Sequence, residues 1–496
     1  MKNAEVVGLP GIESRGAAIC LAIIICTIAG MTAWAQRSGP ASGGERTGGT
    51  PTAAASSSSP SAYEFKVIFS FDTMAGGFHP TSGLFLDSSG NLYGMTGAGG
   101  SLDYGVVFEL SPPSPSGGRG WTETVLHSFP TAPHDCADPL YGGLLVDASG
   151  NVYYACGDVV SELSFQGGQG GVGGGEWVDT NIYVFDYESA AVGALVSDKS
   201  GNIYGATAIG GDYSCLSDGC GAVYELSPPA GGGTGSWTET TLYAFQGGST
   251  GMFPESGVVF DASGNLYGTA SSGGNTVACP RTPQIGDPGC GVVYKLSPPT
   301  GGSGPWTETV LYAFTGSFDG AYPYQSLVMD ESGNLYGTTL DGGDLSCSGD
   351  LGPGCGVVFE LSPPSSGSGA WTETVLHKFT GVSQHSADSD GFFPVTSYSM
   401  AIDPWGNLYG VTFGGGSENF CQSGGCGTVF RVSPPGGSHG WEESILHAFR
   451  GWGDGLLPLT SVTMDAAGNL YGTMEEGGKD LCAGGCGTVY ELSPVR

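Results

Sequence analysis

The amino-acid sequence predicts an all-β fold: a seven-bladed β-propeller with four antiparallel strands per blade, closed by an N-terminal strand that completes the last blade. Three observations predict this fold. One motif recurs seven times along the chain. Each copy is accompanied by a set of short β-prone runs, four to a repeat. The fourth run is missing from the last copy and stands first in the chain instead.

The recurring motif is Asp-x-x-Gly-Asn followed by an aliphatic residue and Tyr. It begins at Asp87, Asp147, Asp198, Asp261, Asp330, Asp403 and Asp465. Its glycine can adopt the left-handed conformation that a short hairpin requires, and its aspartate can cap the turn. Asp and Asn oxygens are also calcium ligands, but the motif supplies too few of them for a dedicated site. We therefore expect hairpin turns and no cofactor, with calcium as the alternative.

Each copy of the motif lies within the same longer pattern. An apolar run such as 327–329 precedes it, and Asn-Leu-Tyr-Gly, as at 265–268, follows. A Gly-rich segment then leads to Gly-Val-Val-Phe-Glu-Leu-Ser-Pro-Pro, as at 356–364, and a second loop leads to Trp-Thr-Glu-Thr-Val-Leu-Tyr, as at 306–312. Short runs bounded by turn residues favour strands, and Ser-Pro-Pro ends the third strand because proline cannot donate to the ladder.

The two ends of the repeat region predict a closed ring. The Trp-containing fourth run follows only six of the seven repeats, and the last repeat ends at 487–494 without it. The missing run is found at 63–71, where Tyr63 stands at the Trp position. An open array would leave two unpaired strand edges, whereas a ring in which 63–71 completes the last blade leaves none.

The N-terminal region predicts an exported protein. Lys2 and Arg15 precede a nearly continuous apolar run at 17–33, and Ala33-Trp34-Ala35 offers a cleavage site of the Ala-x-Ala type. We therefore expect a signal peptide over 1–35, a flexible Ser/Gly/Pro-rich linker over 36–62 and the propeller over 63–496. The alternative is that the apolar run stays uncleaved as a membrane anchor.

Composition and charge limit the classes of partner. The chain has 496 residues, with 92 glycines and 30 prolines, yet 39% of it is hydrophobic, which is enough to build a large core. A formal net charge of −33 argues against binding to nucleic acid or to anionic membrane surfaces. Polysaccharides and envelope proteins remain compatible partners, and we expect the protein to be a monomer.

The cysteines predict a disulfide framework. Cys20 and Cys26 lie in the predicted signal peptide, and the remaining twelve are an even number in an exported chain. The expected pairs are Cys136–Cys156, Cys215–Cys220, Cys279–Cys290, Cys347–Cys355, Cys421–Cys426 and Cys482–Cys486. Zinc is the competing interpretation, but the spacings vary from repeat to repeat and only Cys136 has a nearby histidine, His134.

Strand alternation predicts which face carries the variable loops. In a four-stranded meander, the connection between the second and third strands lies at the same end as the connection to the next blade. The disulfide loops should therefore share a face with the Asp-Gly segments at 319–320, 390–391 and 454–455. Variable loops on a rigid ring are where recognition usually occurs, so we expect binding on this face.

No catalytic, cofactor-binding or metal-binding constellation is recognisable in the sequence. His127, His377 and His447 share one position of the fourth strand, where other repeats have Phe or Tyr, which indicates packing. The repeated glutamates of the third and fourth strands recur blade after blade, unlike a single active site; we expect them to form solvated rows or to pair across blades. Two Gly-x-Ser-x-Gly matches, at 247–251 and 436–440, lie in Gly-rich loops outside the strand-to-helix context of a nucleophile elbow.

The words Asp-x-x-Gly-Asn-Leu-Tyr-Gly-Thr-Thr and Gly-Val-Val-Phe-Glu-Leu-Ser-Pro resemble the GloVer (Gloeobacter/Verrucomicrobia) tandem repeat. Residues 334–361 and 265–296 match well, and the resemblance extends over about 63–496. It implies an exported bacterial protein of the choice-of-anchor type and no particular reaction. The second repeat departs most, because Tyr154-Ala155-Cys156 replaces Gly-Thr-Thr. More distantly, the Gly-Asn-Leu-Tyr strand is similar to NHL-type propellers, which bind partners or, in some relatives, act as lyases or lactonases.

The sequence thus predicts a secreted or cell-envelope protein, extracellular or periplasmic, that acts as a binding or scaffolding propeller for a polysaccharide or an envelope protein. The alternative is a propeller enzyme, a lyase, lactonase or glycan-active enzyme, with its site at the central channel. An unmatched acid, His or Arg pointing into the channel would favour the enzyme, and equivalent positions in every blade would favour a multivalent binder.

Overall fold

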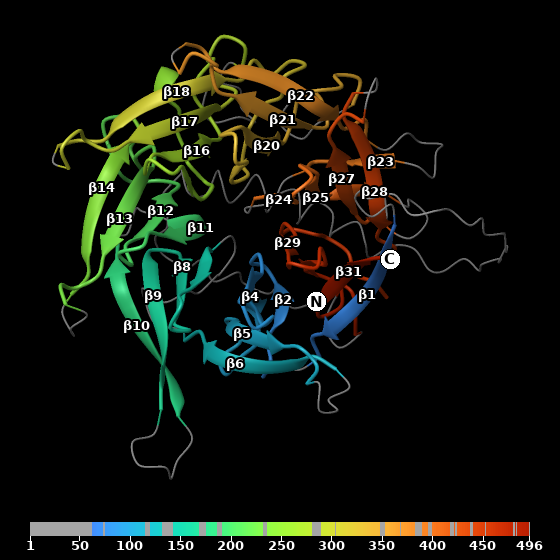
Figure 1. The fold of residues 1–496 in the computed structure, drawn as a ribbon. Coiled ribbons are helices and arrows are strands. Elements are labelled where there is room, and N and C mark those ends of the chain that lie inside the picture. Colours follow the sequence, from blue (N-terminus) through green and yellow to red (C-terminus); the bar gives the residue numbers. More distant parts are fainter. Residues whose placement is uncertain are drawn as a thin grey trace, which may run out of the picture.

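The computed structural model describes most of the repeat region. The described residues are 62–72, 75–114, 120–130, 142–167, 175–185, 191–231, 236–279, 289–302, 304–347, 353–367, 369–381, 389–394, 399–416, 421, 424–436, 440–451, 453–479, 482 and 484–495. The predicted signal peptide and nearly all of the predicted linker lie outside them. Seven four-stranded antiparallel blades form a ring, which confirms the predicted seven-bladed propeller (Figure 1).

In the first six blades, the strands follow one another in the chain from the inner edge to the outer edge. The first four blades comprise β3 (Phe85–Leu86), β4 (Leu92–Ala98), β5 (Val106–Ser111) and β6 (Thr122–Ser128); β7 (Leu144–Val146), β8 (Val152–Cys156), β9 (Val159–Gln166) and β10 (Glu176–Val184); β11 (Ala191–Ser197), β12 (Ile203–Thr207), β13 (Ala222–Ser227) and β14 (Thr238–Ala244); and β15 (Val259–Phe260), β16 (Leu266–Ala270), β17 (Val292–Ser297) and β18 (Thr307–Ala313).

The last three blades continue the same order. They comprise β19 (Val328–Met329), β20 (Leu335–Thr339), β21 (Val357–Ser362) and β22 (Thr372–Lys378); β24 (Ala401–Ile402), β25 (Leu408–Thr412), β27 (Thr428–Ser433) and β28 (Glu442–Ala448); and β29 (Thr463–Met464), β30 (Leu470–Met474), β31 (Thr488–Pro494) and β1 (Tyr63–Ser70). Short strands β2 (Phe78–Pro80), β23 (Ser389–Phe392) and β26 (Gly414–Gly416), with the 3-10 turn η1 (Gly248–Thr250), lie in the connections. Within each blade, the strands are called first to fourth from the inner edge to the outer edge.

The N-terminal strand closes the ring. β1 pairs antiparallel with β31, with Tyr63 opposite Pro494, Val67 opposite Tyr490 and Ser70 opposite Thr488. Figure 1 shows this first strand as the outermost strand of the last blade. The predicted closure is therefore confirmed, and it gives the edge of the final blade a hydrogen-bonded partner.

The repeated Asp-x-x-Gly-Asn motif forms the turn between the first and second strands of every blade. In the fifth blade, Asp330 Oδ1 accepts the amide N–H groups of Ser332 at 2.9 Å and Asn334 at 2.8 Å. Oδ2 accepts the side-chain amide of Asn334 at 2.8 Å and the hydroxyl of Tyr336 at 3.2 Å. Gly333 adopts φ of +83°, which favours glycine. The other six turns repeat these contacts, so the carboxylates of the motif are used by protein donors.

Neighbouring blades pack through aromatic side chains. The Trp that begins a fourth strand packs against the second-strand Tyr of the preceding blade, as Trp371 does on Tyr267 with ring centroids 6.1 Å apart. In the closing blade, Tyr63 takes the place of Trp and its ring centroid lies 6.2 Å from that of Tyr409. The third strands of the blades are almost completely buried in this core. The apolar core therefore consists of clusters in the seams, each built from two neighbouring blades.

Five connections between blades share a residue with positive φ directly before a proline. His79, Phe253, Tyr322, Phe393 and Leu457 all have φ between 52° and 60°, which is costly for a bulky side chain. Backbone hydrogen bonds on both sides hold this conformation. Tyr322, for example, donates its amide to Cys290 of the preceding blade at 2.9 Å and accepts the amide of Leu340 at 3.0 Å. The connection between blades is thus tied directly to a cysteine.

Candidate functional site

Five disulfides lie on one face of the ring, each in the connection between the second and third strands of a blade. They are Cys215–Cys220, Cys279–Cys290, Cys347–Cys355, Cys421–Cys426 and Cys482–Cys486. The second cysteine of each pair is buried, and the first is half-buried. Cys156 is also disulfide-bonded. Cys136 lies outside the described residues, so the Cys136–Cys156 pair stays a prediction.

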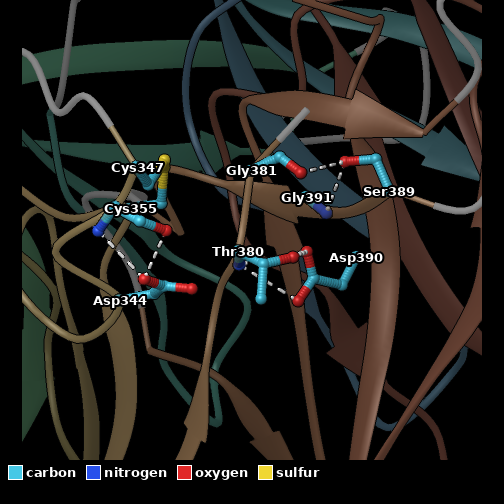
Figure 2. The surroundings of a disulfide bond; sticks show 9 residues. Asp344, Cys347, Cys355, Thr380, Gly381, Ser389, Asp390 and Gly391 are labelled. Atoms are coloured by element: carbon cyan, nitrogen blue, oxygen red, sulfur yellow. Dashed lines mark hydrogen bonds between the residues drawn. A yellow bond between two sulfur atoms is a disulfide. The ribbon is translucent and has the colours of Figure 1, made fainter. Parts of the chain in front are cut away.

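The loop that leads to the next blade lies directly over the disulfide. A Cβ atom on Gly316 would lie 2.5 Å from the sulfur of Cys279, and one on Gly381 would lie 2.6 Å from the sulfur of Cys347. Figure 2 shows Gly381 beside the Cys347–Cys355 bond. Glycine is required at these positions because no side chain fits between loop and disulfide. The two loops of a blade therefore form one unit on one face, as strand alternation predicts. We call this surface the disulfide face.

An aspartate organises the inter-blade loop in three consecutive blades. Asp319 accepts the amide and hydroxyl of Thr315 at 2.9 and 2.6 Å and the hydroxyl of Tyr312 at 3.0 Å. Asp390 accepts the amide and hydroxyl of Thr380 in the next blade (Figure 2). These contacts fold the loop back onto the fourth strand, so its outer residues are held in a defined position.

Two histidines of the fourth strands lie close to these loop aspartates. Nε2 of His377 lies 3.2 Å from Oδ2 of Asp390, and Nε2 of His447 lies 3.0 Å from Oδ2 of Asp454. Each also packs on the Phe two residues later, and Tyr312 occupies the same position in the fourth blade. The position is a packing position that also reaches a loop carboxylate. The Asp-Gly dipeptides were visible in the sequence, but only the fold shows that they face these histidines.

Carboxylates of the fourth strand lie in the seams between blades. Asp179 of β10 lies 4.0 Å from His127 of the first blade and accepts the hydroxyl of Tyr154 at 2.9 Å. Burial raises the pKa of Glu308 to about 7, and that of Glu123 to about 7 with a contribution from Asp72. The expectation of solvated rows is therefore wrong for these fourth-strand acids, because the adjacent blade covers them. The structure places these acids against the neighbouring blade.

The inner ends of the blades hold small polar residues that bind one another. Ser326 Oγ accepts the amide of Gly257 at 2.8 Å across a seam, and Thr338 donates to the Pro394 carbonyl at 2.6 Å. A Cβ on Gly193 would lie 2.4 Å from the amide nitrogen of Gly257, so the third and fourth blades touch through their backbones. The Ser, Thr and Gly residues at these inner positions use their hydrogen-bonding groups within and between the blades.

Among the described residues, no group of three or more His, Cys, Asp or Glu side chains is arranged to hold a metal ion. Within the same part of the chain, no helix has the length and apolarity needed to span a bilayer.

Comparisons with known proteins agree with the repeat type. Residues 179–397 match the family model of the Gloeobacter/Verrucomicrobia repeat, which confirms the resemblance over that region. No curated protein matches the chain in sequence.

Solved structures similar to the chain have low sequence identity. They include the extracellular domain assigned to a hybrid two-component system of B. thetaiotaomicron (TM-score 0.44, 12% identity, 88% of this chain and 41% of that one). A luciferin-regenerating enzyme has a TM-score of 0.37, 14% identity and coverage of 87% and 95%. A Trichoderma reesei carbohydrate-active enzyme of family AA12 has a TM-score of 0.35, 12% identity and coverage of 71% and 92%. The chain thus spans about two fifths of the first neighbour's length.

Proposed function

We propose that this propeller, whose residues 179–397 match the Gloeobacter/Verrucomicrobia repeat, is an exported binding or scaffolding protein that holds its ligand on the disulfide face. Five disulfides in one chain support an oxidising location, the cell envelope or the extracellular space. The ligand classes that suit an acidic protein in this location are an envelope protein or a polysaccharide.

One observation carries the proposal: the loops of the disulfide face are pairwise locked to a rigid ring while their outer residues stay exposed. Gly316 lies on the Cys279–Cys290 disulfide, and Asp319 fastens the same loop to β18. Loops fixed in this way lose little conformational entropy when they bind, which favours affinity. The opposite face is formed in part by the Asp-x-x-Gly-Asn turns, whose carboxylates already accept hydrogen bonds within the turn.

The test is to map binding to one face. Fluorescently labelled protein is applied to a glycan array and to immobilised envelope proteins, with and without calcium, before and after disulfide reduction. We expect bound signal that falls after reduction while circular dichroism still shows the β-sheet fold. Binding that is lost on substitution of Trp405, which lies in the turn between β24 and β25 on the opposite face, would contradict the proposal. So would steady turnover of a bound glycan or lactone, which would favour the enzyme alternative.

A further inference from the structure

Exposed apolar side chains lie along the disulfide face in the third to fifth blades. Tyr213, Val277 and Leu345 lie in the loops between second and third strands and are 43%, 89% and 37% exposed. Phe318 lies in the loop from the fourth to the fifth blade and is 61% exposed. We call these four residues the apolar arc. Single exposed apolar side chains are common on protein surfaces, but these four stand on neighbouring loops of one face.

The loops of the apolar arc are joined to one another. Gly274, three residues before Val277, donates its amide to Gly248 at 2.7 Å, and Gly343 donates its amide to Ser317 at 2.9 Å. Gly247 and Gly316 lie on the disulfides of the third and fourth blades. A chain of hydrogen bonds and disulfides therefore links the loop of Tyr213 to that of Leu345. The loops that carry the arc are therefore neighbours on the disulfide face and are fastened to one another.

Acidic side chains accompany the apolar ones. Asp212 and Asp344 each directly precede an arc residue and are partly exposed to solvent. Hydrogen bonds from the Ser214 hydroxyl and amide hold the pKa of Asp212 below its usual range, and those from Ser346 do the same for Asp344. Both carboxylates therefore stay ionised. Lys378 lies over the Phe318 ring at 4.7 Å, which shows that a cation is accepted on the arc.

We propose that the apolar arc docks a protein surface that presents apolar side chains together with Lys or Arg. The inference rests on the proposed function and names its partner class. Aliphatic tips such as Val277 and Leu345 match apolar protein side chains, and Lys378 already lies over the Phe318 ring on which a sugar could stack. Ionised Asp212 beside Tyr213 and Asp344 beside Leu345 complement basic residues, and they would repel an acidic partner.

The test uses three synthetic 18-residue peptides of equal length: an amphipathic Leu/Lys helix, a Leu/Glu helix and a Ser/Lys peptide with the charge of the first. Titration by fluorescence anisotropy should show saturable binding of the Leu/Lys peptide, at least tenfold tighter than the Ser/Lys peptide, and no binding of the Leu/Glu peptide. The double variant Val277→Ser, Phe318→Ser should weaken Leu/Lys binding at least tenfold, and so should Asp212→Asn, Asp344→Asn. Trp405→Ser, an equally exposed apolar residue on the opposite face, should leave it unchanged.

The outcomes separate this inference from the proposed function. Absence of saturable Leu/Lys binding, or equal binding by the arc variants and the wild type, overturns the proposed partner class. If the same arc variants lose binding to an arrayed glycan, the disulfide face is still the binding face and only the partner class is wrong. If neither peptide nor glycan binding responds to arc substitutions or to reduction, the proposed function fails as well. Melting curves of each variant check that the exposed substitutions leave the ring intact.

Discussion

Tyr312 donates its hydroxyl to Asp319 at 3.0 Å, and the same two positions carry His377 with Asp390 and His447 with Asp454 in the next two blades. The exchange of Tyr for His at one geometric position indicates that the aspartate needs a polar partner, not a base. In all three blades the same aspartate also accepts a backbone amide of its loop. The arrangement is a structural loop clamp that is repeated, and not a catalytic pair.

The loop clamp predicts unequal effects for its two halves. Asp319→Ala removes the acceptor of the Thr315 amide and hydroxyl and of Tyr312, so the free energy of unfolding should fall by about 1–3 kcal/mol. Tyr312→Phe removes only one of these bonds and should cost about 1 kcal/mol or less. Urea denaturation of both variants checks this order. A larger effect for Tyr312→Phe than for Asp319→Ala would contradict the view that Asp319 mainly stabilises the loop.

Ring closure and the turn motif could be predicted because they depend on residues that are local or repeated. The Asp330 turn needs only Asn334 and Gly333 nearby, and the position of 63–71 follows from what the last repeat lacks. The pairing of five disulfides follows from short loop spacings. These features do not require knowledge of how one blade lies against the next.

The seams could not be predicted because they depend on the neighbouring blade. Alternation along β18 places Trp306, Glu308 and Val310 on one face, but the sequence does not show that the third blade covers that face. The glutamate was therefore expected in solvent or in a pair across blades. The positive φ of Tyr322 was also invisible, since the residue before proline normally favours an extended conformation.

Seam glutamates should make the propeller less stable as the pH rises toward neutrality. Burial raises the pKa of Glu123, Glu308, Glu373 and Glu443 to about 7 from an ordinary value of 4.5. Between these values the folded protein binds more protons than the unfolded chain, so stability decreases with rising pH in that window. The lowered pKa of His79, caused by burial, acts in the opposite direction near pH 6.5 but is a single group.

Melting temperatures measured across this window test the effect. We expect Tm to fall between about pH 5 and about pH 7 and to change little just above it. Glu308→Gln, which removes one of these groups and keeps the shape, should reduce the slope by less than about a quarter, because burial also raises the pKa of Glu162 and Glu476. A Tm that rises steadily from pH 5 to pH 7 would contradict this assignment.

Three buried tyrosine hydroxyls should be removable without lowering the free energy of unfolding. The hydroxyls of Tyr224, Tyr294 and Tyr490 are buried and have no hydrogen-bond partner among the described residues. Phe359 occupies the equivalent position opposite the second-strand glycine in the fifth blade. Tyr294→Phe should therefore leave the free energy of unfolding unchanged or raise it, because an unsatisfied polar group is removed.

The matched control for this substitution is Tyr336→Phe. The hydroxyl of Tyr336 donates to Asp330 at 3.2 Å, so its loss should lower the free energy of unfolding by about 1 kcal/mol. Urea denaturation of the two single variants compares a satisfied with an unsatisfied hydroxyl in the same fold. Equal destabilisation by both substitutions would indicate that Tyr294 has a partner, such as a buried water.

Removal of the closing strand should open the ring, and the strand should be replaceable from outside. β1 supplies the whole outer edge of the last blade, and its Phe65 ring stacks on His447 with centroids 3.8 Å apart. A chain that begins after residue 71 exposes the edge of β31, so it should melt at a lower temperature and associate through that edge. A synthetic peptide of residues 62–71 should restore Tm and suppress the association by adding the missing strand. A peptide of the same composition in scrambled order should not, because register sets which side chains enter the seam.

A chain that begins at residue 62 retains β1 and serves as the control for truncation itself. If the shorter chain melts at the same temperature as this control, β1 contributes nothing to closure and another contact must hold the first and last blades together.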